Sequence, residues 1–154
     1  MEQRRQPPAT DAPEIPIACD LHVFTRSEQA AHLALCTDAL VRWPSERLEL
    51  EDGYVFRYVG DEERFLTLAR WAAGEHRCCP WAAYSVEMGP FRAGERGRIE
   101  VRVRARAEGK EFLTAAYRYL SALDGASPPE ALLASTEKLT LATLAQRLKA
   151  GCGC

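Results

Sequence analysis

The chain has 154 residues, of which 47% are hydrophobic and 27% charged, and its formal net charge is −2. This length suits a single domain with its own hydrophobic core, and the small net charge gives no bias towards nucleic acid or anionic membranes. No apolar run approaches the roughly 20 residues of a membrane span, so we expect a cytosolic protein with no membrane or nucleic-acid partner. In the cytosol the six cysteines are expected to be reduced.

The chain divides into three predicted parts. Residues 1–14 contain arginines and prolines without apolar periodicity, which is typical of a disordered leader. Residues 15–124 alternate strand-like and helix-like patterns and are predicted to form one α+β domain that carries the thiol site. Residues 125–154 are predicted to form a helical extension with a flexible Cys-Gly-Cys tail, because leucines recur at helical intervals over Ala131–Lys149.

The first half of the domain contains a predicted strand, two helices and a hairpin. Strand-forming residues predict a strand at about 16–19, and helical spacing after capping signals predicts a helix over Gln29–Trp43. Residues 46–58 alternate in polarity on both sides of Asp52-Gly53, a dipeptide typical of two-residue hairpin turns. A further capping signal then predicts a helix over Glu62–Cys78.

The second half contains two more strands and a third helix. Trp81–Met88 and Arg98–Arg106 are predicted to pair, and the strict alternation of the second strand predicts one buried and one solvated face. Gly109 is predicted to break the chain before a helix over Lys110–Leu123.

This order of elements predicts the fold class. Helices over an antiparallel sheet form a two-layer α+β sandwich, with the helices on one face of the sheet and the helical extension following it. The order βαββαββα fits a ferredoxin-like arrangement that contains split βαβ units.

Two adjacent cysteines, Cys78 and Cys79, lie at the predicted end of a helix and directly before Pro80. Proline cannot continue a helix and favours an extended conformation in the residue before it, so both sulfurs should lie near one helix end. A disulfide between the two would be strained, because neighbouring Cα atoms lie about 3.8 Å apart, less than the roughly 4.4–6.8 Å of a relaxed disulfide. Glu75 and His76 are predicted to lie beside the pair and to orient its ligands, with His76 on the buried face of the helix.

The favoured hypothesis for the cysteines is a soft-metal site. Thiolates select Cu(I), Zn(II) or a toxic thiophilic metal such as Hg(II), and two to four sulfurs are enough to bind one ion. Cys78 and Cys79 would be the inner ligands, with Cys19 as a third, while Cys152 and Cys154 on the tail would capture the metal or close the site. The predicted function is therefore heavy-metal sequestration, transfer or detoxification; the metal identity and any turnover stay open.

Two alternatives to the metal hypothesis are kept open. The tail could instead act as the shuttle of a thiol-disulfide oxidoreductase, with a thiol as the partner in place of a metal ion. A helix C-terminus disfavours a free thiolate, which ranks this second. The other alternative, ranked third, is an interaction domain whose cysteines are incidental, since free cysteine is often buried as packing. A homodimer is left open, and packing is also the favoured role for His32 and Cys36, although their i, i+4 spacing can chelate a metal.

The chain resembles a family of small, largely uncharacterised bacterial proteins with a Glu-x-x-Cys-Cys-Pro-aromatic motif. The likeness covers about residues 15–123 and rests on Ile17–Cys19, Gly60-Asp61, Glu75–Trp81 and Gly109–Leu113. The resemblance implies that the sulfurs of Cys19, Cys78 and Cys79 recur together and share one site. It implies no particular reaction, and it does not include the extension that carries Cys152 and Cys154.

Overall fold

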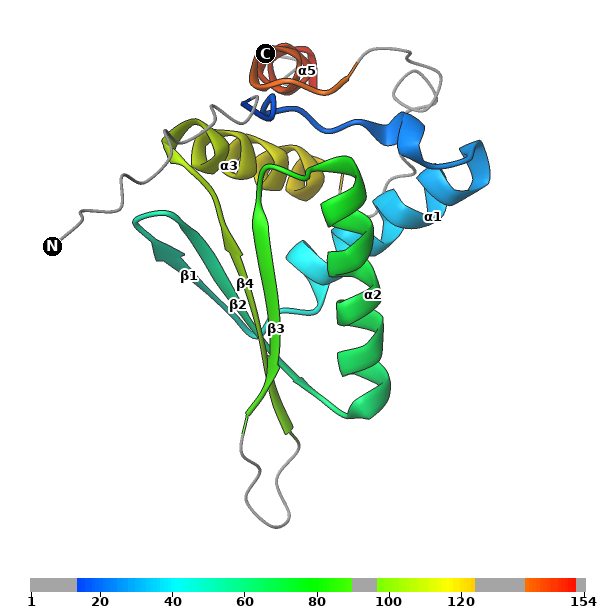
Figure 1. The fold of residues 1–154 in the computed structure, drawn as a ribbon, viewed down its shortest axis with the longest axis vertical. Coiled ribbons are helices and arrows are strands. Elements are labelled where there is room, and N and C mark those ends of the chain that lie inside the picture. The colour runs from blue at the N-terminus through cyan, green and yellow to red at the C-terminus, as the bar shows by residue number, and fades with distance from the viewer. Residues whose placement is uncertain (1–13, 90–96, 124–137, 152–154) are drawn as a thin grey trace, which may run out of the picture.

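A computed structural model describes residues 14–89, 97–123 and 138–151 of the chain (Figure 1). Its sheet has four antiparallel strands, and α-helices cover one face of that sheet, so the predicted two-layer α+β fold is confirmed. No helix in these ranges is both long enough and apolar enough to cross a lipid bilayer. The helical elements are the short 3₁₀ turn η1 (Leu21–Val23), α1 (Arg26–Thr37), the π-helical turn η2 (Asp38–Arg42), α2 (Glu62–Cys78), α3 (Ala107–Ala122) and α5 (Leu141–Gly151). The strands are β1 (Glu46–Leu50), β2 (Gly53–Gly60), β3 (Ala83–Met88) and β4 (Gly97–Arg104).

The strands lie in the order β1-β2-β4-β3. Both β2 and β3 are antiparallel to β4, which lies between them, so β2-α2-β3 is a split βαβ unit. The first predicted strand, at 16–19, is wrong: the segment forms only an isolated bridge between Cys19 and Leu139. Pro16 has no backbone N–H to donate to a strand ladder, and the bridge partner lies in the C-terminal part of the chain rather than in the sheet.

The predicted hairpin is present, with its turn one residue earlier than expected. Leu50 pairs with Gly53, so the two-residue loop is Glu51-Asp52 rather than Asp52-Gly53. Beyond the turn, the side chains of Tyr54, Phe56 and Tyr58 are buried against the helices. The buried face continues in β4, where Ile99, Val101 and Val103 alternate with more exposed residues as predicted.

The helix starts follow their capping residues. The hydroxyl of Thr25 and the carboxylate of Glu28 form a capping box at the start of α1, which begins three residues before the predicted start and leads into η2. The carboxylate of Asp61 accepts a hydrogen bond from the amide of Arg64 and caps α2, whose bounds match the prediction.

The break predicted at Gly109 is wrong, because α3 starts at Ala107 and Gly109 lies within its first turn. A Cβ atom at this position would lie about 3.0 Å from the ring of Trp81, so glycine lets that indole approach the helix. The predicted helix over 131–149 is described only from residue 138 onwards. Within the described residues, α5 begins at Leu141, because Leu139 pairs with Cys19 in a β-bridge.

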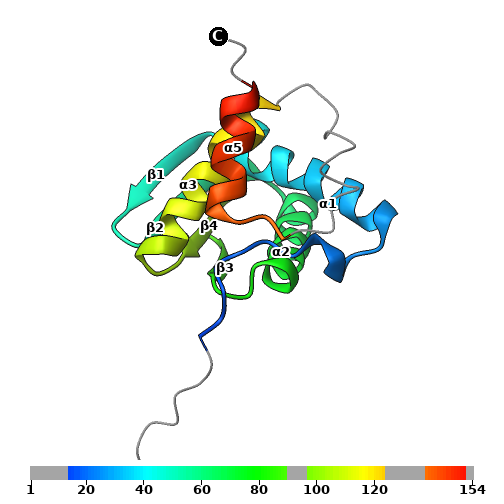
Figure 2. The same ribbon diagram turned by 90° about the horizontal axis from the view of Figure 1, so that it is seen from above.

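The C-terminal segment packs on the domain. Helix α5 contacts α3 and lies over it in the view from above (Figure 2). Leu144 of α5 is 2% exposed and belongs to the same apolar cluster as Cys78 and Cys79. The predicted leader up to residue 13 and the tail cysteines Cys152 and Cys154 lie outside the described residues.

Candidate functional site

The two adjacent cysteines lie where α2 ends. Cys78 is the last helical residue, and Cys79 follows with φ −130° and ψ 63° while its amide still donates to the carbonyl of Glu75. The residue before Pro80 has thus left the helical region, as expected, although its ψ falls short of the fully extended range that proline favours. The Cys78 and Cys79 side chains are only 1% and 3% exposed, and their Sγ atoms lie 3.7 Å apart.

Cys19 comes from a segment far away in the sequence and joins this pair. The amide of Asp20 donates to the carbonyl of Cys78 at 2.9 Å, which fixes the segment against the end of α2. On the other side, Cys19 and Leu139 exchange two backbone hydrogen bonds of 2.8 and 2.9 Å. The Sγ atoms of Cys19, Cys78 and Cys79 all lie within 4.8 Å of one another, and we call these three residues the thiol cluster.

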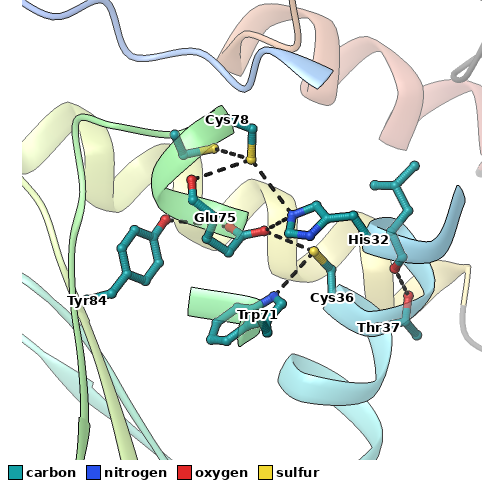
Figure 3. Close-up of polar contacts among 9 residues, drawn as sticks. His32, Cys36, Thr37, Trp71, Glu75, Cys78 and Tyr84 are labelled. Carbon is teal, nitrogen blue, oxygen red and sulfur yellow. Dashed lines mark hydrogen bonds and ion pairs between the residues drawn. The ribbon is translucent and has the colours of Figure 1, made fainter. Parts of the chain in front are cut away.

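The carboxylate of Glu75 organises a group of polar side chains beside the thiol cluster (Figure 3). Its Oε1 lies 2.8 Å from His32 Nε2 and accepts a hydrogen bond of 2.9 Å from the Cys36 thiol. Its Oε2 faces the hydroxyl of Tyr84 at 3.5 Å. The same His32 Nε2 is 3.8 Å from Cys78 Sγ, so the imidazole connects the carboxylate to the thiol cluster. His32, Glu75 and Cys78 form a second set of ligand atoms within 4.8 Å of one another.

A close approach of two helices places His32 at this position. A Cβ atom on Gly74 would lie 2.9 Å from His32 Cε1 and Nδ1, so only glycine leaves room for the imidazole of α1 against α2. The Cys36 sulfur, one helical turn further along α1, accepts a hydrogen bond of 3.4 Å from the indole of Trp71. Burial and the nearby Glu75 carboxylate both raise the pKa of the Cys36 thiol, which therefore stays neutral.

Charge is distributed unevenly over the cluster. Hydrogen bonds from the Cys19 and Cys79 thiols, together with the His32 imidazole, lower the pKa of Cys78 far below its usual value. Burial opposes protonation of His32, but Cys78 and Glu75 outweigh that effect and raise the pKa of the imidazole to about 9. Hydrogen bonding with Cys78 raises the pKa of Cys19, and the neighbouring thiols together with burial raise that of Cys79. These directions make Cys78 the most acidic thiol of the cluster and favour the charged form of the imidazole beside it.

The residues expected from the sequence are only partly brought together. Cys19, Cys78, Cys79 and Glu75 meet, but His76 is exposed, so its predicted place on the buried face is wrong. Successive residues of a helix are rotated by about 100°. Because Glu75 points towards α1, the next residue, His76, points to solvent. The histidine of the site is His32, whose polar contacts go beyond the packing role expected for it. The i, i+4 spacing of His32 and Cys36 is the sequence signal that points to a polar role for His32.

Comparison of the chain with protein-family models, with curated proteins and with solved structures gives no match. The resemblance to the Glu-x-x-Cys-Cys-Pro-aromatic family therefore stays a prediction.

Proposed function

We propose that the thiol cluster binds one soft metal ion of the Hg(II), Cu(I) or Zn(II) type, and that the protein serves heavy-metal sequestration or transfer. The observation that carries this proposal is the convergence of Cys19 with Cys78 and Cys79, whose sulfurs lie within 4.8 Å of one another. Soft thiolate ligands select such metals. Three of them from two distant parts of the chain are a more specific feature than an adjacent pair at a helix end.

The sulfur spacing supports a shared ion. Zinc–sulfur bonds are about 2.3 Å long, so two thiolates on one tetrahedral ion lie about 3.8 Å apart. Cys78 and Cys79 already have their sulfurs 3.7 Å apart. A third sulfur from Cys19 within the same small sphere needs only a side-chain adjustment to complete a trigonal set.

The surroundings of the cluster also favour a cation. The thiols lie at the C-terminus of α2, where the helix dipole disfavours negative charge, and in an apolar cluster with Leu139 and Leu144. A bound metal ion would supply the positive charge that several thiolates need there. The imidazolium of His32 supplies part of it for Cys78 in the metal-free protein.

Cys152 and Cys154 have a subsidiary role in this proposal. They would capture the ion at the surface and transfer it to the buried cluster by thiolate exchange, since each exchange replaces one metal–sulfur bond with another. This role rests on the sequence of the Cys-Gly-Cys tail alone.

Thiol-disulfide exchange is the second candidate, and the lowered pKa of Cys78 favours it. The geometry of His32 argues against a Cys-His-carboxylate catalytic triad, however. In such a triad the acid contacts the imidazole nitrogen opposite the nucleophile, whereas Cys78 and Glu75 both approach Nε2. Cys78 is also only 1% exposed, so a partner disulfide could not reach it without local opening.

Metal titration under a non-thiol reductant tests the proposal. We expect one equivalent of Hg(II) or Cu(I) to produce ultraviolet thiolate-to-metal absorption, and Cys19→Ser, Cys78→Ser and Cys79→Ser each to weaken binding. Cys36→Ser is the matched control, because Cys36 is a buried thiol of the same neighbourhood that contacts Glu75 and lies outside the cluster. Cys152→Ser/Cys154→Ser should slow metal uptake and leave the final stoichiometry unchanged.

Two results would contradict the proposal. The first is the absence of metal-dependent absorption in the reduced wild-type protein. The second is metal binding that disappears in the tail double variant and persists in all three cluster variants. A mixed disulfide trapped between Cys154 and Cys78 or Cys79 would favour the redox candidate instead.

A further inference from the structure

An apolar cavity adjoins the thiol cluster. Its volume is about 80 Å³, and Cys19, Cys79 and Glu75 form part of its wall. Most of the remaining wall consists of aliphatic and aromatic side chains from the sheet, α1, α3 and α5. The exposed Arg47 also lines it, so the cavity reaches from the buried thiols towards the surface.

Among the described residues, one buried hydroxyl in the wall has no hydrogen-bond partner. It belongs to Tyr119, which is 8% exposed, and it makes no hydrogen bond with the described residues. Buried hydroxyls normally find a partner, and an unmet one costs about 1–3 kcal/mol. An alkyl group would not satisfy this hydroxyl, so the inference rests on the unfilled apolar volume beside Cys19 and Cys79, which is space that a bare ion would not use.

We propose that the cargo of this site is an organometal cation, R–Hg⁺ or a similar soft-metal monoalkyl, with its alkyl group in the cavity and its metal on Cys79 and Cys19. The inference rests on the proposed soft-metal function and names its substrate class. A bare ion would use the sulfurs and leave the apolar space empty. An alkyl-metal cation would fill the cavity with its hydrophobic alkyl group and bind the sulfurs with its thiophilic metal.

The loading step is a ligand exchange without a change of oxidation state. An alkylmercury chloride loses its mercury–chloride bond and gains a mercury–sulfur bond to Cys79, while the carbon–mercury bond stays intact. Chloride leaves with its electron pair, and the thiol proton of Cys79 passes to solvent. Cys19 then lies close enough to provide a second sulfur contact.

The cavity volume sets the expected length of the alkyl group. A water molecule occupies about 30 Å³ of liquid, and a methyl group is of similar size. A cavity of about 80 Å³ therefore holds two or three such groups. Affinity should rise by about fourfold for each added methylene, at about 0.8 kcal/mol per buried methylene, from methyl to n-propyl, and then level off.

Competition against glutathione measures this dependence. Methyl-, ethyl-, n-propyl- and n-butylmercury chloride are titrated into the reduced full-length protein, and each affinity is divided by that of the same compound for glutathione. This ratio removes the intrinsic strength of the mercury–sulfur bond. Hg(II) is titrated alongside, so that metal binding and alkyl recognition are measured separately.

Three variants of α3 test the cavity itself. Ala116→Leu fills it and should flatten the chain-length dependence while Hg(II) still binds. Leu113→Ala enlarges it and should extend the rise in affinity to n-butyl. Ala122→Leu is the control, because Ala122 is exposed at the end of α3 and lines no part of the cavity, so its dependence should equal that of the wild type.

A flat series in the wild type, with Hg(II) binding intact, would overturn the organometal inference and leave the metal proposal standing. A rising series that Ala116→Leu and Leu113→Ala both leave unchanged would also overturn it. Failure of Hg(II) and all alkylmercury compounds to bind would refute the proposed function itself.

Discussion

Glu75 is the residue on which the polar interior depends. Its single carboxylate accepts from Cys36 and contacts His32 and Tyr84, so it joins side chains from α1, α2 and β3. Buried donors that lose their acceptor keep the full cost of desolvation. Glu75 therefore matters for the fold before any metal binds.

Replacing Glu75 should reveal this dependence. We expect Glu75→Ala to lower the free energy of unfolding of the metal-free protein by about 2–4 kcal/mol, because it leaves several buried polar groups without a partner. Glu75→Gln should cost less, since its amide oxygen can still accept one hydrogen bond. Urea denaturation measures both. Glu111→Ala, at an exposed position of α3, serves as the control and should change stability by less than about 0.5 kcal/mol.

The His32 imidazole should titrate unusually high in the metal-free protein. Its pKa of about 9 lies above the usual 6.5, so protonation of His32 stabilises the fold fully below pH 6.5. That contribution is lost as the pH rises through about 9. NMR titration of the ring should give the raised pKa directly, and Glu75→Gln should lower it, because a carboxylate that favours the imidazolium is gone. An unshifted His32 pKa in the wild type would show that the charged pair does not form.

At the scale of elements, Trp81 connects the segment that contains Cys19 to the end of α2. Its indole N–H donates to the carbonyl of Ala18 at 2.9 Å, next to Cys19, and its ring packs edge-on against Phe112. Gly109 allows this packing by keeping α3 free of a side chain there. The indole thus holds the segment that carries the third sulfur.

Trp81→Phe should weaken both stability and metal binding. Loss of the hydrogen bond to Ala18 is expected to cost about 1 kcal/mol in urea denaturation. The metal affinity should fall in the wild type and stay unchanged in a Cys19→Ser background, because the effect acts through the position of Cys19. Trp43→Phe is the control: its ring lies against the Arg64 guanidinium and lines no part of the cavity. Equal losses of affinity in both backgrounds would contradict the role assigned to Trp81.

The elements that depend on local sequence patterns could be predicted from the sequence. The capped helix α2, the hairpin and the alternating strand β4 depend on neighbouring residues, and their patterns predicted them. The pairing of Cys19 with Leu139 depends on tertiary packing between distant segments, so strand-forming composition at 16–19 was misleading. The same holds for His32 and Glu75, whose contact requires the close approach of α1 to Gly74.

At the scale of the whole molecule, the thiol cluster ties together parts of the chain that local structure leaves independent. Cys19 contributes one sulfur and is hydrogen-bonded to Leu139, which directly precedes α5. Cys78 and Cys79 contribute the other sulfurs from the end of α2. A metal ion on all three sulfurs would therefore cross-link the N-terminal segment, α2 and, through Leu139, the C-terminal helix.

This cross-link predicts a stability change that spreads beyond the site. A ligand that binds only the folded state at about 100 times its dissociation constant raises the free energy of unfolding by about 2.7 kcal/mol. We expect Hg(II) or Cu(I) to give at least this increase, and a competing soft-metal chelator to reverse it. Hydrogen exchange should slow most at the amides of Cys19 and Leu139, since these two amides hydrogen-bond the segment of Cys19 to the residue that precedes the C-terminal helix. In Cys19→Ser the metal is expected to bind the adjacent pair more weakly, and the protection at Leu139 should be lost. Protection that persists there would show that the ion does not join the two ends of the domain.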